Sequence, residues 1–127
     1  MDRKWVWIAT EVALAAHAEQ LAEHGGGEGV RDAGALESAM MRPCNLALYE
    51  DPDAAALAAA YAFGIARNHP IVDGNKRTAA VFAETSLALN GRELVASDAQ
   101  LVVAILDLAA GGLSEAELAD WFRAHLA

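Results

Sequence analysis

The chain has 127 residues, the usual size of one domain, and carries 18 acidic residues against nine basic ones, for a formal net charge of −9. This acidic balance opposes binding to nucleic acid and to anionic membranes. The single cysteine, Cys44, excludes an intramolecular disulfide, and the longest apolar run is too short to span a bilayer, so we expect a cytoplasmic protein in a reducing compartment.

The N-terminal quarter is predicted to hold a short strand and a helix. Residues 5–8, WVWI, are aromatic and β-branched, which is typical of a strand. Thr10 is a candidate N-cap for a helix that ends at the glycine-rich loop 25–29. The chain contains 31 alanines, and because alanine is the best helix former this composition favours closely packed helices.

A second, shorter helix is expected over residues 33–41. Asp32 is its candidate N-cap, and Pro43 is expected to end it because proline cannot continue a helix without losing a hydrogen bond. The segment 45–49, NLALY, has no helical period, and we expect it to form a short extended piece.

Two apolar helices are predicted on either side of one short polar loop. Asp51 and Pro52 are the candidate N-cap and first residue of a helix over about 53–67, which is apolar almost all round and therefore expected at the centre of the domain. The next helix begins at Asn75, and Gly91 is expected just past its end.

The C-terminal third is predicted to add a short strand and two helices. Residues 92–96 are a candidate partner strand for residues 5–8. The last two helices begin at capping boxes, namely Ser97 with Gln100 and Ser114 with Glu117. The whole chain, 1–127, is thus expected to form a single mainly α domain with a minor β element.

The polar loop between the two apolar helices has the features of an anion site. A helix N-terminus presents free N–H groups, and Gly74 allows a ligand to approach the backbone before Asn75. Lys76 and Arg77 then place two cations in the first turn, where each costs roughly 0.3–1 kcal/mol. A bound phosphate would offset that cost, since it suits both a helix N-terminus and an arginine fork.

Two further residues extend this site toward group transfer. Asp73 beside a phosphate is repulsive unless a divalent cation such as Mg²⁺ bridges the two. His69 has an unperturbed pKa of about 6.5 and can act as a general base near neutrality. These are the components of phosphoryl or nucleotidyl transfer. Each residue alone also fits a cap, a turn or a solvated charge, so a non-catalytic phosphate-binding or nucleotide-binding module stays open.

The stretch HPIVDGNKRTAA, residues 69–80, resembles the signature of the Fic/Doc family. Three further segments resemble the corresponding segments of small Doc-type toxins, namely GVRDAGALESAMMRP, AAAYAFGIARNHP and LALNGREL. The resemblance covers about residues 5–126 and implies a compact, mainly α fold with the motif in a loop between two central helices.

The resemblance also implies a role for each motif residue. It places the general base on His69, the Mg²⁺ carboxylate on Asp73 and the phosphate-contacting arginine on Arg77. The anion-binding turn falls on Gly74, Asn75 and Lys76. In relatives an extended flap holds the target segment by strand-like pairing, and residues 45–49 are the candidate flap here.

Three departures from the family pattern bear on the reaction. Lys76 stands where the adenylylating branch has glycine, and Ala80 stands where that branch has a second arginine. The Asn-Lys-Arg form resembles the Doc branch, which implies transfer of the terminal phosphate of ATP to a hydroxyl of a translation factor such as elongation factor Tu. We therefore favour a protein kinase-like phosphotransferase over AMP or nucleotidyl transfer. Ile71 replaces the usual phenylalanine, which bears on activity rather than on fold.

No Ser/Thr-x-x-x-Glu-Gly/Asn inhibitory motif is present in the sequence. The resemblance therefore implies restraint by a separate antitoxin, whose disordered tail folds onto the toxin. The expected partners are this antitoxin and the target protein, with no nucleic acid and no membrane.

Overall fold

The structure is a computed structural model that describes residues 5–9, 11, 12, 15, 33–68 and 75–127. Five helices are assigned in this part, namely α2 (Ala33–Tyr49), α3 (Ala54–Asn68), α4 (Asn75–Leu89), α5 (Asp98–Ala110) and α6 (Glu115–Ala124). The predicted mainly α fold is therefore confirmed. Among the described helices, none combines the length and the apolar character that crossing a bilayer requires.

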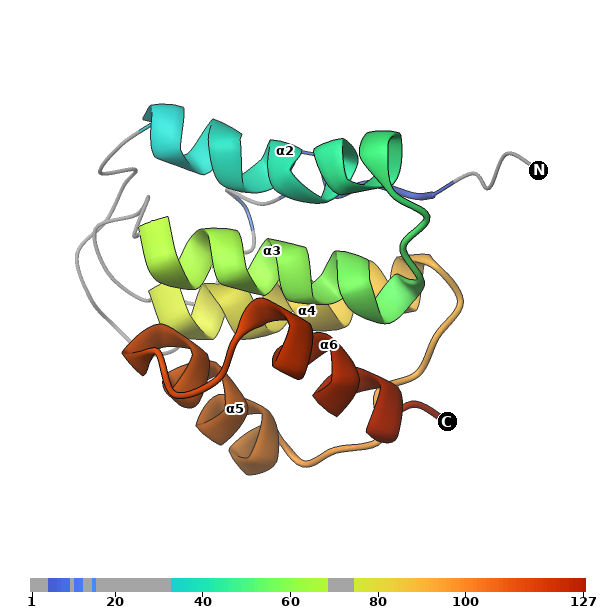
Figure 1. The fold of residues 1–127 in the computed structure, drawn as a ribbon, viewed down its shortest axis with the longest axis vertical. Coiled ribbons are helices and arrows are strands. Elements are labelled where there is room, and N and C mark those ends of the chain that lie inside the picture. The colour runs from blue at the N-terminus through green and yellow to red at the C-terminus, as the bar shows by residue number, and fades with distance from the viewer. Residues whose placement is uncertain (1–4, 10, 13–14, 16–32, 69–74) are drawn as a thin grey trace.

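Helix α3 lies at the centre of the fold, as its apolar sequence predicted. It contacts α2, α4, α5 and α6, and Figure 1 shows α2 and α4 on either side of it. Small residues make this close packing feasible. Gly64 faces Ala39 of α2, and a Cβ atom added at Gly64 would lie only 2.9 Å from the Ala39 Cα. The close approach of α2 to α3 therefore depends on glycine at position 64.

The predicted end of the second helix at Pro43 is wrong, because α2 continues to Tyr49 with Pro43 inside it. A proline inside a helix removes one backbone hydrogen bond at a cost of about 3 kcal/mol. Burial offsets that cost, since Pro43 is fully buried. The Glu50 N–H also donates to the Leu46 carbonyl at 2.9 Å, which continues the helical pattern. Residues 45–49 are thus helical, and the expected extended flap is not formed there.

The N-cap of α3 lies two residues after Asp51, the N-cap that the sequence predicted. Asp53 is its N-cap, because its Oδ1 accepts from the Ala56 N–H at 2.9 Å and its carbonyl accepts from the Leu57 N–H. The two serine capping boxes are confirmed, with both reciprocal bonds formed at α5 and at α6. Gly91 is also confirmed past the end of α4, with a φ of 78° in the left-handed region.

The predicted pairing of residues 5–8 with 92–96 is wrong. Residues 5–9 have no strand assignment, and Leu94 instead forms an isolated antiparallel bridge with Leu126 near the C-terminus. The Asn90 side chain takes the place of a partner strand, since it accepts from the Val6 N–H at 2.8 Å and donates to the Val6 carbonyl at 3.1 Å. The Ile8 N–H donates to the Tyr61 hydroxyl at 3.0 Å, which ties this segment to α3.

Several predicted features lie outside the described residues. They are the cap Thr10, the loop 25–29 and the cap Asp32. Of the helix expected after Thr10, residues 11, 12 and 15 are described, and all three are helical. The predicted extent of one domain over 1–127 stays a prediction.

Candidate active site

The candidate site lies where the two central helices end. The C-terminal end of α3 and the N-terminal end of α4 are at the same side of the molecule (Figure 1), because only six residues connect them. The predicted site residues His69, Asp73 and Gly74, as well as Ile71, belong to that connection and lie outside the described residues. Asn75 is the first residue of α4, as predicted.

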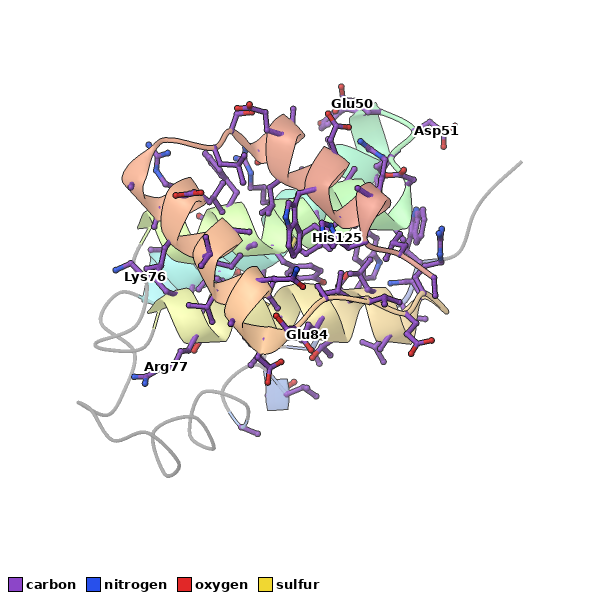
Figure 2. All side chains as sticks on the ribbon, turned by 90° about the horizontal axis from the view of Figure 1, so that it is seen from below. Glu50, Asp51, Lys76, Arg77, Glu84 and His125 are labelled. Carbon is purple, nitrogen blue, oxygen red and sulfur yellow. The ribbon has the colours of Figure 1, made fainter. Side chains whose placement is uncertain are left out.

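Lys76 and Arg77 are the two predicted site residues whose side chains the structure describes. Both belong to the first turn of α4, where Lys76 is exposed and Arg77 is half-buried. Figure 2 shows both side chains at this end of the molecule, directed away from the helices. Neither makes an ion pair with any other residue in the described part of the chain. The first turn of α4 contains no acidic residue, so the helix N-terminus adds its own positive potential to theirs.

Arg67, the third basic residue of this region, has a structural explanation that the other two lack. It lies in the last turn of α3, where a cation is favoured by the helix dipole. Its guanidinium also lies 5.5 Å from the centre of the Phe63 ring. The Arg42 guanidinium lies 4.4 Å from the same ring and pairs with Glu115 at 2.6 Å. Arg67 and Arg42 therefore stabilise the packing of α3, whereas Lys76 and Arg77 have no such partner within the described chain.

The inner face of α4 next to these cations is buried. Ala79 and Ala80 are core residues, so position 80 supplies no charge to the site. Thr78 is only 2% exposed, and its hydroxyl has no hydrogen-bond partner among the described residues. Sequence reasoning did not single out Thr78. The signal was available, because position 78 shares the helical face of the buried residues Phe82 and Ser86, four and eight residues further on.

Three of the described acidic side chains lie away from the two cations. Glu50 and Asp51 lie at the opposite end of the molecule from Lys76 in Figure 2, in the turn between α2 and α3. Glu84, two turns further along α4, lies near Asp98 of α5, and partial desolvation followed by this like charge raises the pKa of Glu84. Among the described residues, the first turn of α4 therefore contributes two cations and no acidic side chain, on a chain whose net charge is −9.

A metal ion at this end would depend on residues of the connecting loop. Within the described part of the chain, no three histidine, cysteine or acidic side chains converge as a ready metal site. Mg²⁺ does not need such a set, because it commonly uses one or two carboxylates together with phosphate oxygens and water. The cationic first turn of α4 fits the phosphate part of that arrangement.

Comparison with known proteins identifies the class to which this fold and site belong. The sequence profile described as the Fic/DOC family matches residues 7–87, which is more than half of the chain. This span includes α2, α3, most of α4 and the whole candidate site. The chain belongs to the Fic/DOC family, as its motif predicted.

Two relatives place the chain within the Doc branch. A protein named Toxin Doc, from Mycolicibacterium smegmatis, is 46% identical over 98 residues, which cover 76% of this chain and 68% of the relative. A protein named Protein kinase doc, from Escherichia phage P1, is 32% identical over 117 residues, which cover 91% of this chain and 92% of the relative. The chain is therefore a Doc-type member of the family.

Proposed function

We propose that this protein is a Doc-type toxin that transfers the terminal phosphate of ATP to a hydroxyl side chain of a target protein. The observation that carries the proposal is the pair of cations, Lys76 and Arg77, on the first turn of a buried helix where no described carboxylate neutralises them. An anionic ligand explains that placement, and the name of the phage relative, Protein kinase doc, supports a phosphoryl group as the part transferred.

In the proposed reaction, His69 takes the proton from the target hydroxyl. The hydroxyl oxygen then forms a bond to the γ-phosphorus of ATP, and the bond from that phosphorus to the bridging oxygen breaks. ADP leaves with the electron pair of the broken bond, and His69 later releases its proton to water. Asp73 is the residue that would hold Mg²⁺, which supplies charge neutralisation at the phosphates when it is bound.

The remaining motif residues position the nucleotide. The backbone at Gly74 and Asn75 and the ammonium of Lys76 would bind phosphate oxygens at the α4 N-terminus. The guanidinium of Arg77 would contact two oxygens of the transferred group at once, which a lysine cannot do. We favour phosphate transfer over AMP transfer because Lys76 occupies space next to the phosphates and because Ala80 is buried in the core and adds no second guanidinium.

ATP labelled separately at the α and γ positions tests the reaction. The purified chain is incubated with Mg²⁺, labelled ATP and a bacterial lysate, and the proteins are separated. We expect label on a protein from γ-labelled ATP only. Label from α-labelled ATP would show AMP transfer instead. If neither ATP labels a protein, the result would favour a non-catalytic phosphate-binding or nucleotide-binding module.

Matched variants test whether labelling of the target depends on the candidate site. His69→Ala and Arg77→Gln should each abolish transfer. Arg92→Gln is the control, since Arg92 is an exposed arginine in the turn after α4 and removes the same charge elsewhere. Equal activity of Arg77→Gln and Arg92→Gln would contradict the proposed role of Arg77.

The proposed partners are a translation factor, with elongation factor Tu as the first candidate, and a cognate antitoxin. The relative named Toxin Doc supports the antitoxin, because a toxin of this type has to be restrained in its own cell. Mass spectrometry of the labelled protein should show the mass of one phosphoryl group on a hydroxyl residue. Co-purification with the product of the neighbouring small reading frame tests the antitoxin, and consistent failure of the two proteins to bind would count against it.

A further inference from the structure

Helix α5 is apolar on two opposite faces. Leu101, Ala104, Ile105 and Leu108 form the inner face and are buried against the rest of the molecule. A second set follows a helical spacing of three, four, seven and eleven residues and faces solvent, namely Ala99, Val102, Val103, Leu106 and Ala110. We call this second set the outer stripe of α5.

The three largest side chains of the outer stripe are exposed to solvent. Val102, Val103 and Leu106 are 41%, 57% and 45% exposed. A helix at the surface of a monomer normally has a polar outer face, and a helix that is apolar all round is normally buried. Helix α6 follows the first pattern, since its exposed positions include Glu117, Asp120 and Arg123.

No described helix covers the outer stripe. Helix α5 contacts α3, α4 and α6. It lies at the lower edge of the molecule in Figure 1 and on the near side in Figure 2, which views the molecule from below. The stripe is about 16 Å long at 1.5 Å per residue, the length of a short helical binding segment. Contiguous exposed apolar surface of this kind marks interaction sites more often than isolated apolar side chains do.

The charges around the outer stripe indicate the kind of partner. Asp98 and Asp107 are both exposed and flank the stripe on its two sides, Asp107 being four residues after Val103 and three before Ala110. Glu84 of α4 lies near Asp98 and adds a third acidic group at that end. Helix α5 itself contains no lysine or arginine. A second copy of the chain, with a net charge of −9, would bring further acidic surface to this face.

We propose that the outer stripe of α5 binds an amphipathic α-helix of a partner protein whose apolar face is flanked by lysine and arginine side chains. Val103 and Leu106 would pack into the apolar face of that helix, and Asp98 and Asp107 would pair with its basic flanks. This docking face is separate from the α4 N-terminus, so binding there does not depend on the proposed phosphate transfer.

Synthetic peptides of defined sequence test the proposal. One peptide of about 20 residues carries leucine and alanine at helical spacing with lysine and arginine on both flanks, and its twin carries glutamate on the flanks. Binding of each to the full chain is measured by fluorescence anisotropy at 150 mM salt. We expect the basic peptide to bind and the acidic twin to bind at least about tenfold more weakly.

Variants of the chain assign the binding to this face. The double variant Val103→Gln with Leu106→Gln should weaken binding of the basic peptide by about tenfold or more. Leu48→Gln is the matched control, because Leu48 is an exposed leucine of α2, 74% exposed, and its variant should bind as the wild type does. Asp107→Lys should reduce the preference of the chain for the basic peptide over its acidic twin. Circular dichroism checks that each surface variant keeps its helices.

Three outcomes would overturn the proposal. The first is no binding of the basic peptide, and the second is equal binding by the double variant and the control. The third is a concentration-dependent dimer in sedimentation that Leu106→Gln abolishes, since this would make a second copy of the chain the occupant of the face. Phosphate transfer should be unchanged in the double variant, so failure here leaves the proposed activity to be judged by its own assay.

Discussion

The carboxylate of Asp53 stabilises the protein in two ways that substitutions can separate. Its Oδ1 caps α3 by accepting from the Ala56 N–H. The same carboxylate receives a fork from Arg123 of α6, with the Arg123 Nε 2.6 Å from Oδ2 and an Arg123 terminal nitrogen 2.9 Å from Oδ1. Asp53→Asn keeps the capping oxygen and removes the charge, whereas Asp53→Ala removes both.

The expected losses differ by about a factor of two. An N-cap contributes about 1 kcal/mol. The ion pair is 43% exposed on each side, so solvent screening limits it to roughly 0.5–1 kcal/mol even with two-point geometry. We expect Asp53→Asn to lower the free energy of unfolding by about 1 kcal/mol and Asp53→Ala by about 2 kcal/mol. Urea denaturation at pH 7 measures both, and Arg123→Gln completes a double-mutant cycle with Asp53→Asn.

The dependence on pH gives an independent check. Hydrogen bonding from Arg123 holds the pKa of Asp53 below its ordinary value. A carboxyl group whose pKa is lowered by folding contributes stability above its unfolded-state pKa of about 3.9, and this contribution is lost as the pH falls through the lower folded-state pKa. The gap between wild type and Asp53→Asn should therefore shrink as the pH approaches about 2. A gap that stays constant from pH 7 to acid, or an Asp53→Asn loss equal to that of Asp53→Ala, would refute the reasoning.

Three further predictions follow from the central helices. Gly64→Ala should lower the free energy of unfolding by about 1–2 kcal/mol in a denaturant titration. The new Cβ would lie 2.9 Å from the Ala39 Cα, and this overpacking outweighs the gain of about 1 kcal/mol in helix propensity. A variant more stable than the wild type would show that α2 can shift away from α3 at little energetic cost. Thr78→Val keeps the shape of a buried side chain whose hydroxyl has no described partner, so we expect the melting temperature to stay level or to rise by a few degrees, whereas a clear drop would reveal a hydrogen bond to that hydroxyl. Lys76→Gln and Arg77→Gln each remove a cation from the first turn of α4. Each should raise the free energy of unfolding by about 0.3–1 kcal/mol and weaken the binding of ATP measured by calorimetry. If both variants are less stable than the wild type, the argument for a bound anion at this helix end fails.

Local signals in the sequence determined much of the fold. The capping boxes at Ser97 and Ser114 form as predicted, and Gly91 lies past the end of α4, because each of these depends on residues within one helical turn. The central place of α3 followed from its lack of a polar face. The motif from His69 to Arg77 also identified the family without any knowledge of the fold, since it depends on spacing within nine residues.

Tertiary structure decided the features that depend on distant partners. Pro43 lies inside α2, where its ring is buried by the rest of the fold. A rule that treats proline as the end of a helix considers only local sequence and cannot include that burial. Asp53 rather than Asp51 caps α3, and the Arg123 side chain that reinforces it comes from 70 residues further along the chain. The partner of Leu94 is Leu126 rather than residues 5–8, because the strand signal in a short segment does not specify which segment it pairs with. The exposed outer stripe of α5 also became visible only in the fold, since apolar periodicity shows that a face exists but not which face the rest of the chain covers.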